Sequence, residues 1–143
     1  MMQAQAIDTT TGGGVPAVEI RVLADATQLS VVRGIAGALA VQHNFDLDAI
    51  ADLRLAVDEA CTQLIRRAVP SSQLICVFRF DGPGIQFAGS VPTASEAEVS
   101  DRGFGWHVLR TLTDDVSIEN SSSPRSGSVT TIEFTKAVAG EHE

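Results

Sequence analysis

Residues that bind transition metals are scarce in this chain of 143 residues, which has two cysteines and three histidines. Cys61 and Cys76 lie inside apolar stretches with no CxxC or other ligand spacing, and the histidines are scattered along the chain. These residues predict no metal centre, and we expect both cysteines to be reduced core residues of a cytoplasmic protein.

Basic residues and long apolar runs are also few. Ten lysines and arginines stand against 18 acidic residues, for a net charge of −8, and so acidic a chain repels nucleic-acid phosphates. No run approaches the roughly 20 apolar residues of a membrane-spanning helix. The first residues, MMQAQAIDTTTGGGVPAV, lack the basic and apolar regions of a secretory signal. We expect no direct contact with nucleic acid or with a membrane.

The composition is that of one soluble domain. Hydrophobic residues make up 44% of the chain and charged residues 20%, and a chain of this length buries a single substantial core. We expect residues 1–16 to form a flexible tail, residues 17–137 the folded domain and residues 138–143 a second tail.

A strand and two helices come first in the predicted order. The apolar–polar alternation of residues 18–24 predicts the strand, and Asp25 or Thr27 can cap the helix that follows. The second helix begins at Asp46 or Asp48 and ends before a proline. It has the stronger apolar stripe, which consists of Ile50, Leu53, Val57, Ala60, Cys61, Leu64 and Ala68.

Hairpins dominate the rest of the chain. Residues 73–80 and 85–90 predict two strands joined by the turn DGPG, and residues 115–120 and 128–136 predict a closing hairpin. A loop and a short helix, FGWHVLRTLTD, separate the two hairpins. This order predicts an α+β fold, a two-layer sandwich of a mixed, mostly antiparallel sheet with helices on one face.

The pair Glu59 and Gln63 is the first candidate for chemistry. The two residues stand four apart, so they share a helical face, and that face lies opposite the apolar stripe with Asp52 and Arg66. The pair is either a general base with its neighbour or the solvated side of a helix. Spacing alone leaves both interpretations open.

The second candidate is the stretch DRGFGWHVLR, in which Gly103 and Gly105 come directly before or at the start of a helix. Glycines let the backbone approach a ligand closely, and the N-terminus of a helix favours phosphate. Glycines in such a place are also common in ordinary loops that bind nothing. The motif by itself is a weak indication of a phosphate site.

Taken together, these elements resemble a known family. The order of strand, helices, hairpin, loop, glycine-led helix and hairpin resembles the ATP-binding domain of gyrase, Hsp90, histidine kinases and MutL, which is the GHKL or Bergerat fold. Within it the chain resembles the RsbW-like anti-sigma factors that are also serine protein kinases. The segments that carry the resemblance are LRLAVDEACTQLIRRAV, RGFGWHVLRTLTDDVSIEN and SVTTIEFTK, and it covers roughly residues 17–137.

The resemblance implies roles for individual residues. Glu59 stands where the family has the general base that activates the attacking serine or water. Gln63 stands where it has an asparagine that ligates Mg²⁺, and its longer side chain displaces the amide oxygen from the geometry that Mg²⁺ demands. Gly103 and Gly105 match the glycines that face the phosphates of ATP.

On the adenine side the chain departs from the family. Thr130 matches the hydroxyl that helps to hold adenine. Ser128 matches it instead if the alignment with the family has a gap in the preceding turn. The family's adenine-binding aspartate falls at Gly89 or Ser90, where this chain has no carboxylate. Losing such a hydrogen bond costs about 1.5–3 kcal/mol of binding. The loop of residues 91–102 is also shorter than the family's lid.

Members of this family dimerise and sequester an alternative sigma factor, for which an anti-anti-sigma protein of the STAS type competes. Arg33 matches a family arginine that faces these partners, although an ordinary exposed arginine has the same spacing. The resemblance implies a homodimeric anti-sigma factor with a degenerate ATP and Mg²⁺ site. The alternative is an active serine protein kinase that uses ATP and Mg²⁺ to phosphorylate the STAS protein. A third hypothesis is an adaptor of the same fold, unrelated to sigma factors.

Overall fold

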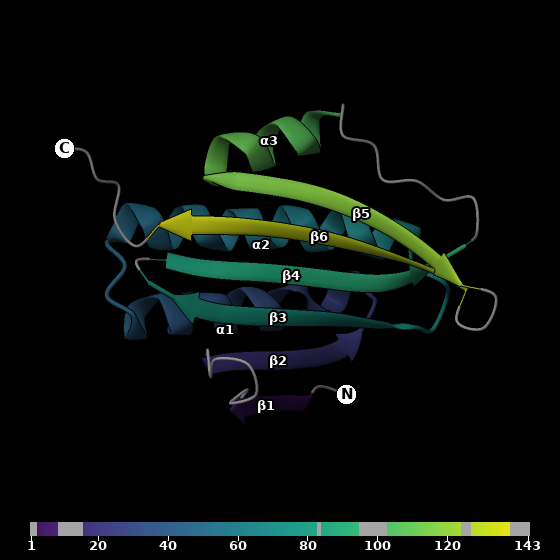
Figure 1. Cartoon of the computed structure of the whole chain (residues 1–143), viewed down its shortest axis with the longest axis horizontal. Coiled ribbons are helices and arrows are strands. Elements are labelled where there is room, and N and C mark those ends of the chain that lie inside the picture. Colours follow the sequence, from purple (N-terminus) through teal and green to yellow (C-terminus); the bar gives the residue numbers. More distant parts are fainter. Residues whose placement is uncertain (1–2, 9–15, 83, 95–102, 124–126, 138–143) are drawn as a thin grey trace.

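The computed structural model describes residues 3–8, 16–82, 84–94, 103–123 and 127–137. In this part of the chain, a six-stranded sheet packs against three α-helices. Figure 1 shows the sheet in front and α1 and α2 behind it, with α3 beside the edge strand β5. The two-layer α+β architecture predicted from the sequence is confirmed.

The strand order of the sheet is β1-β2-β3-β4-β6-β5, so the last strand is inserted between β4 and β5. Every strand pairing among the described residues is antiparallel, which makes the sheet simpler than the mixed one that was predicted. The strands are β1 (Gln3–Asp8), β2 (Pro16–Leu23), β3 (Gln73–Asp81), β4 (Gly84–Thr93), β5 (Asp115–Ser123) and β6 (Gly127–Ala137).

Side-chain caps set the starts of the first two helical segments. The carboxylate of Asp25 accepts from the backbone N–H of Thr27 at the short 3₁₀ helix η1 (Ala26–Gln28), which leads into α1 (Leu29–Gln42). At α2 (Leu47–Arg67), Asp46 is the cap, and its Oδ1 accepts from the N–H of Ala49 at 2.8 Å. The helix α3 spans Phe104–Leu112. Both caps satisfy N–H groups that a helix start leaves without partners.

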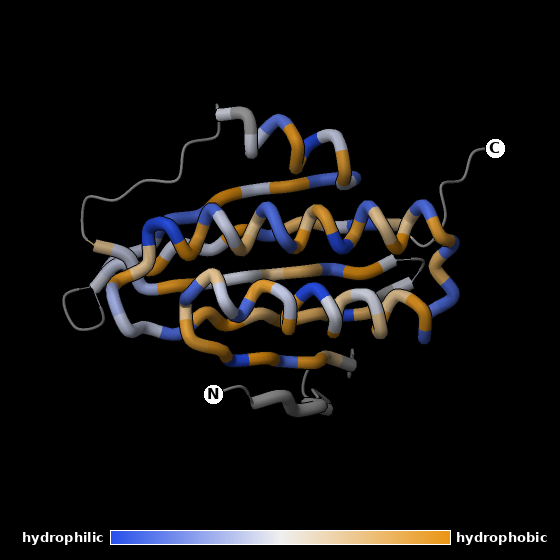
Figure 2. Tube along the Cα trace, turned by 180° about the vertical axis from the view of Figure 1, so that it is seen from behind, coloured by the Kyte–Doolittle hydropathy of each residue, from blue (hydrophilic) through white to orange (hydrophobic). Residues whose placement is uncertain are grey.

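The core lies between the sheet and the pair α1 and α2. Figure 2, seen from the helix side, shows these two helices running side by side across the sheet. Most of the stripe predicted for the second helix is buried, and it meets the inward side chains of the strands. The large side chains that are fully buried include Leu53, Leu64 and Val57 of α2 and Ile20, Leu74, Phe78, Phe87 and Ile132 of the sheet.

Two elements differ from the prediction. The segment expected to be a tail contains β1, which pairs with β2 and adds an edge strand to the sheet. β4 continues to Thr93, three residues beyond its predicted end, and Thr93 forms a bridge with Ala68 after the end of α2. The rest of the predicted lid, residues 95–102, and the predicted C-terminal tail, residues 138–143, lie outside the described residues.

Candidate functional site

Glu59 and Gln63 are in direct contact on α2. The Nε2 of Gln63 donates to the Oε2 of Glu59 at 3.1 Å. Of the two interpretations that spacing left open, the solvated face does not describe Gln63, whose exposed fraction is 8%, while Glu59 is half-buried. The reason is that α3 packs against α2, so that a helix covers part of the face that the helical wheel assigned to water.

Gly105 lies directly over this pair. A Cβ atom at position 105 would overlap both the Nε2 of Gln63 and the Oε2 of Glu59. The absence of a side chain is therefore what lets the first turn of α3 approach α2 so closely. The structure thus brings together three of the residues that the sequence singled out, from two helices more than 40 residues apart in the chain.

Gly103 has a different environment. It is the N-cap of α3, with an extended backbone, and its carbonyl oxygen accepts from the N–H of His107 at 3.2 Å. It is exposed, and a Cβ at this position would meet no atom within 4 Å. Of the two glycines in the motif, only Gly105 stands where the packing leaves no room for a side chain.

The contact between Gly105 and the pair bears on Mg²⁺, which the family resemblance implies here. Mg²⁺ takes six oxygen ligands at about 2.0–2.1 Å and keeps several waters. In this arrangement the ends of the Glu59 and Gln63 side chains occupy the space against Gly105, so these side chains would have to turn away from Gly105 for their oxygens to reach an ion there. Among the described residues, no group of three or more histidine, cysteine, aspartate or glutamate side chains could hold a metal.

Gly89 and Ser90, the two positions matched to the adenine-binding aspartate, point to opposite sides of β4. The Oγ of Ser90 lies 2.8 Å from the Oγ1 of Thr131, on the side of the sheet away from α2. Gly89 faces the core, where a Cβ would come within 3.1 Å of both Leu64 Cδ1 and Phe87 Cζ. Apolar side chains therefore fill the space that an inward carboxylate at position 89 would need.

Thr130 is fully buried and belongs to a short chain of hydrogen bonds. Its hydroxyl donates to the Oδ1 of Asn120 at 2.6 Å and lies 3.3 Å from the hydroxyl of Thr93. Ser128, the alternative to Thr130, is half-buried nearer the β5–β6 turn and pairs with Thr93 in the sheet register. Both hydroxyls lie on the core side of β6, and Thr130 is the more enclosed of the two.

Arg33 has a partner within the chain. Its Nη1 lies 2.5 Å from the Oδ1 of Asp58 on α2, and each side chain is about one-third exposed, at 34% and 32%. The ion pair joins the outer surfaces of α1 and α2 at some distance in sequence from the glycine motif. Arg33 thus pairs with Asp58, the residue directly before Glu59 in the chain.

Three residues with clear contacts were not singled out from the sequence. Asp58 pairs with Arg33, and Thr93 and Asn120 bond to Thr130. Each contact joins residues at least 10 positions apart, and pairings at that separation leave no periodic pattern. The one signal in the sequence was Asp58 itself, which adds a second carboxylate directly before Glu59.

The two cysteines lie behind this site in the core. Cys61, on α2 between Glu59 and Gln63, has its Sγ 3.9 Å from that of Cys76 on β3, and both thiols are free and buried. The hydrogen bond with Cys76 and complete burial raise the pKa of the Cys61 thiol well above its ordinary value. The predicted role of both cysteines as core residues agrees with this burial.

Comparison with known proteins identifies the fold family. Residues 22–136 match the histidine kinase-like ATPase domain. The chain belongs to this family. It is 42% identical over 103 residues to proteins named anti-sigma-F factor RsbW from two strains of Mycobacterium tuberculosis, CDC 1551 / Oshkosh and H37Rv. It is 24% identical over 145 residues to the protein named serine-protein kinase RsbW from Bacillus subtilis strain 168.

These matches confirm the prediction from the sequence that this histidine kinase-like ATPase domain is RsbW-like. The mycobacterial alignment covers 72% of this chain and 61% of each relative, so the chain spans about three fifths of their length. The Bacillus alignment covers 87% of both chains. Within the described residues, no helix combines the length and apolar character that crossing a membrane requires.

Proposed function

We propose that this histidine kinase-like ATPase domain is an anti-sigma factor, which binds a sigma factor of the F type and keeps it from RNA polymerase. The observation that carries the proposal is the 42% identity to relatives named anti-sigma-F factor. A STAS-type anti-anti-sigma protein competes for the same surface and releases the sigma factor. The domain acts as a homodimer in the cytoplasm.

We further propose that binding, and not phosphoryl transfer, is its main activity. Gln63 supports this, because it stands where the family has an asparagine and its longer side chain displaces the amide oxygen from the geometry that Mg²⁺ demands. The apolar surroundings of Gly89 support it as well, since no carboxylate is present there to hold adenine.

Two calorimetric titrations of the purified protein test this function. A sigma-F-type factor is expected to bind with measurable heat, and the STAS protein is expected to displace it. Glu59→Gln, which keeps the size of the side chain, is expected to leave sigma binding unchanged. No heat with the sigma factor would contradict the proposal.

The second candidate function is a serine protein kinase, and the adjacency of Glu59, Gln63 and Gly105 favours it. Titration with ATP, with and without Mg²⁺, separates the two candidates. Tight binding that depends on Mg²⁺, followed by phosphate transfer to the STAS protein that Glu59→Gln abolishes, would establish the kinase. The absence of heat at high ATP concentration would leave the domain a scaffold for protein partners.

A further inference from the structure

The two cysteines of the chain are in contact with each other. Cys61 lies on α2 and Cys76 on β3, 15 positions apart in the chain, and their Sγ atoms are 3.9 Å apart. The sequence contains no other cysteine, and both thiols are free. Because the two sulfurs need to approach by only about 1.9 Å to reach bonding distance, the pair is a dithiol within reach of a disulfide.

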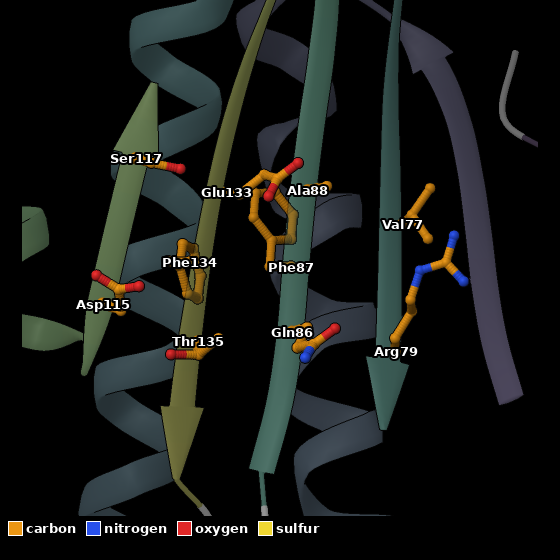
Figure 3. A pocket seen from close by; sticks show the side chains of 10 residues that line it. All are labelled: Val77, Arg79, Gln86, Phe87, Ala88, Asp115, Ser117, Glu133, Phe134 and Thr135. Atoms are coloured by element: carbon orange, nitrogen blue, oxygen red, sulfur yellow. The ribbon is translucent and has the colours of Figure 1, made fainter. Parts of the chain in front are cut away.

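The surroundings of the pair determine how an oxidant reaches it. Both cysteines are fully buried between the helices and the sheet. A hollow of about 230 Å³, shown in Figure 3, lies on the far side of the sheet, and its lining includes Val77 and Ala88. Val77 directly follows Cys76 on β3, so the two side chains point to opposite faces. The backbone of the sheet therefore separates this hollow from the thiol, and a small oxidant reaches the pair when α2 opens locally.

The protonation of the thiols makes the first step of oxidation slow. Burial and the hydrogen bond with Cys76 raise the pKa of the Cys61 thiol, so its reactive thiolate form is scarce. The second step is favoured by contact, because the other sulfur already lies beside the oxidised one and needs no encounter from solution. Such a pair responds to sustained exposure to an oxidant and not to a brief one.

We propose that Cys61 and Cys76 are a site of reversible oxidation, at which hydrogen peroxide forms a disulfide that ties α2 to β3. The peroxide first oxidises one thiol to a sulfenic acid, and its other oxygen leaves as water. The second thiol then attacks that sulfur, and the hydroxyl group leaves with the thiol proton as a second water. The two sulfurs together lose two electrons and two protons, and the peroxide is reduced to two waters. A small dithiol reverses the bond by exchange.

The disulfide acts on the candidate site through α2. Cys61 stands two residues from Glu59 and two from Gln63 on this helix, and the ends of those side chains lie against Gly105 of α3. Drawing Cys61 toward β3 displaces this part of α2 relative to α3. Trp106 follows Gly105, is half-buried and is the only tryptophan of the chain. Its fluorescence therefore reports the displacement.

Mass spectrometry of the full chain after treatment with hydrogen peroxide, without denaturant, tests the site. The expected product is a 15.1 kDa monomer in which a peptide containing Cys61 is linked to one containing Cys76, with the loss of two hydrogen atoms. Dithiothreitol is expected to restore both thiols. Met1 and Met2 are the internal control, because their conversion to sulfoxide shows that the peroxide was active. Circular dichroism checks that the chain stays folded during the reaction.

The matched variants are Cys61→Ala and Cys76→Ala, each of which leaves one thiol. Neither is expected to form the linked product. The fluorescence of Trp106 is expected to change on oxidation of the wild type, to return with dithiothreitol, and to stay constant in both variants. The variants thus separate the effect of the disulfide from any direct effect of peroxide on the indole.

Four results would overturn the proposed site. In the folded protein, these are oxidised methionines beside two intact thiols, or sulfinic or sulfonic acid on either cysteine in place of the linkage. A linkage that appears only in urea would assign the reaction to the unfolded chain. A linked protein with the Trp106 fluorescence of the reduced form would disprove the displacement of α2 at the candidate site. Sigma factor and nucleotide are absent from the experiment, so its result is independent of the proposed function.

Discussion

Arg33 of α1 and Asp58 of α2 form an ion pair, with 2.5 Å between Nη1 and Oδ1. A guanidinium has five N–H donors, and this carboxylate oxygen accepts one of them. Arg33 is therefore held in place by its own chain with donors left for a partner. An arginine held in this way loses less side-chain entropy when it binds an acidic group.

If Arg33 contacts the sigma factor, Arg33→Glu is expected to weaken binding at least about 10-fold, because a carboxylate replaces a guanidinium at the interface. The change also sets a second carboxylate beside Asp58, so its effect on folding needs a control. The double variant Arg33→Asp, Asp58→Arg keeps an ion pair between the helices but moves the cation. It is expected to fold normally and to bind weakly. Calorimetry that finds unchanged affinity in both variants would reduce Arg33 to an ordinary helix ion pair.

Serine substitutions at the two glycines of the motif are expected to have unequal effects on stability. Gly105→Ser pushes against Glu59 and Gln63 and breaks their hydrogen bond, at a cost of about 1–2 kcal/mol in the free energy of unfolding. Gly103→Ser meets open space and adds a good N-cap, so stability is expected to stay within about 0.5 kcal/mol or to rise. Urea denaturation measures both. Equal effects of the two changes would mean that α3 does not rest on α2 through Gly105.

Restoring a carboxylate on β4 is expected to damage the fold at one position and not at its neighbour. Gly89→Asp forces a carboxylate against Leu64 and Phe87 and is expected to cost at least about 2 kcal/mol of stability. Ser90→Asp projects to the side of the sheet away from α1 and α2, where the side chain is half-exposed, and is expected to be tolerated. Thermal unfolding of the two variants distinguishes them. A stable Gly89→Asp protein with higher ATP affinity would show that this part of the core opens to nucleotide.

The Cys61 thiol is expected to resist alkylation in the folded protein, since its pKa is raised by the bond to Cys76 and by burial. The unfolded thiol ionises at lower pH than the folded one. Stability from this group is therefore fully present below the pKa of the unfolded thiol and falls as pH rises toward that of the folded thiol. Iodoacetamide labelling followed by mass spectrometry, with and without urea, measures the difference. Rapid labelling of the native protein would contradict the burial of this thiol.

Local chemistry explains which parts of the fold could be predicted. The cap at Asp46 and the apolar stripe through Leu53, Val57 and Leu64 depend on neighbours within a few residues, and both are confirmed. The two hairpins were also predicted, because alternation and turn residues are local signals. β1 was missed because an edge strand needs no apolar alternation when a neighbouring strand supplies its hydrogen bonds.

The site was harder to predict than the fold because it depends on where α3 packs. Helical periodicity placed Gln63 opposite the apolar stripe of its helix, and its burial follows from the packing of α3 against α2. The ion pair of Arg33 with Asp58 likewise depends on how α1 and α2 align. A sequence pattern specifies one face of one helix, whereas contacts between helices depend on their mutual register.

The insertion of β6 between β4 and β5 has a consequence for the order of folding. Ile132 and Phe134 fill the core, and until β6 emerges from the ribosome β4 has a free edge and β5 has no strand to join. A nascent chain that stops before residue 127 exposes a row of unpaired backbone groups, which favours aggregation. Synthesis of the final strand is therefore the step that commits the whole domain to its native state.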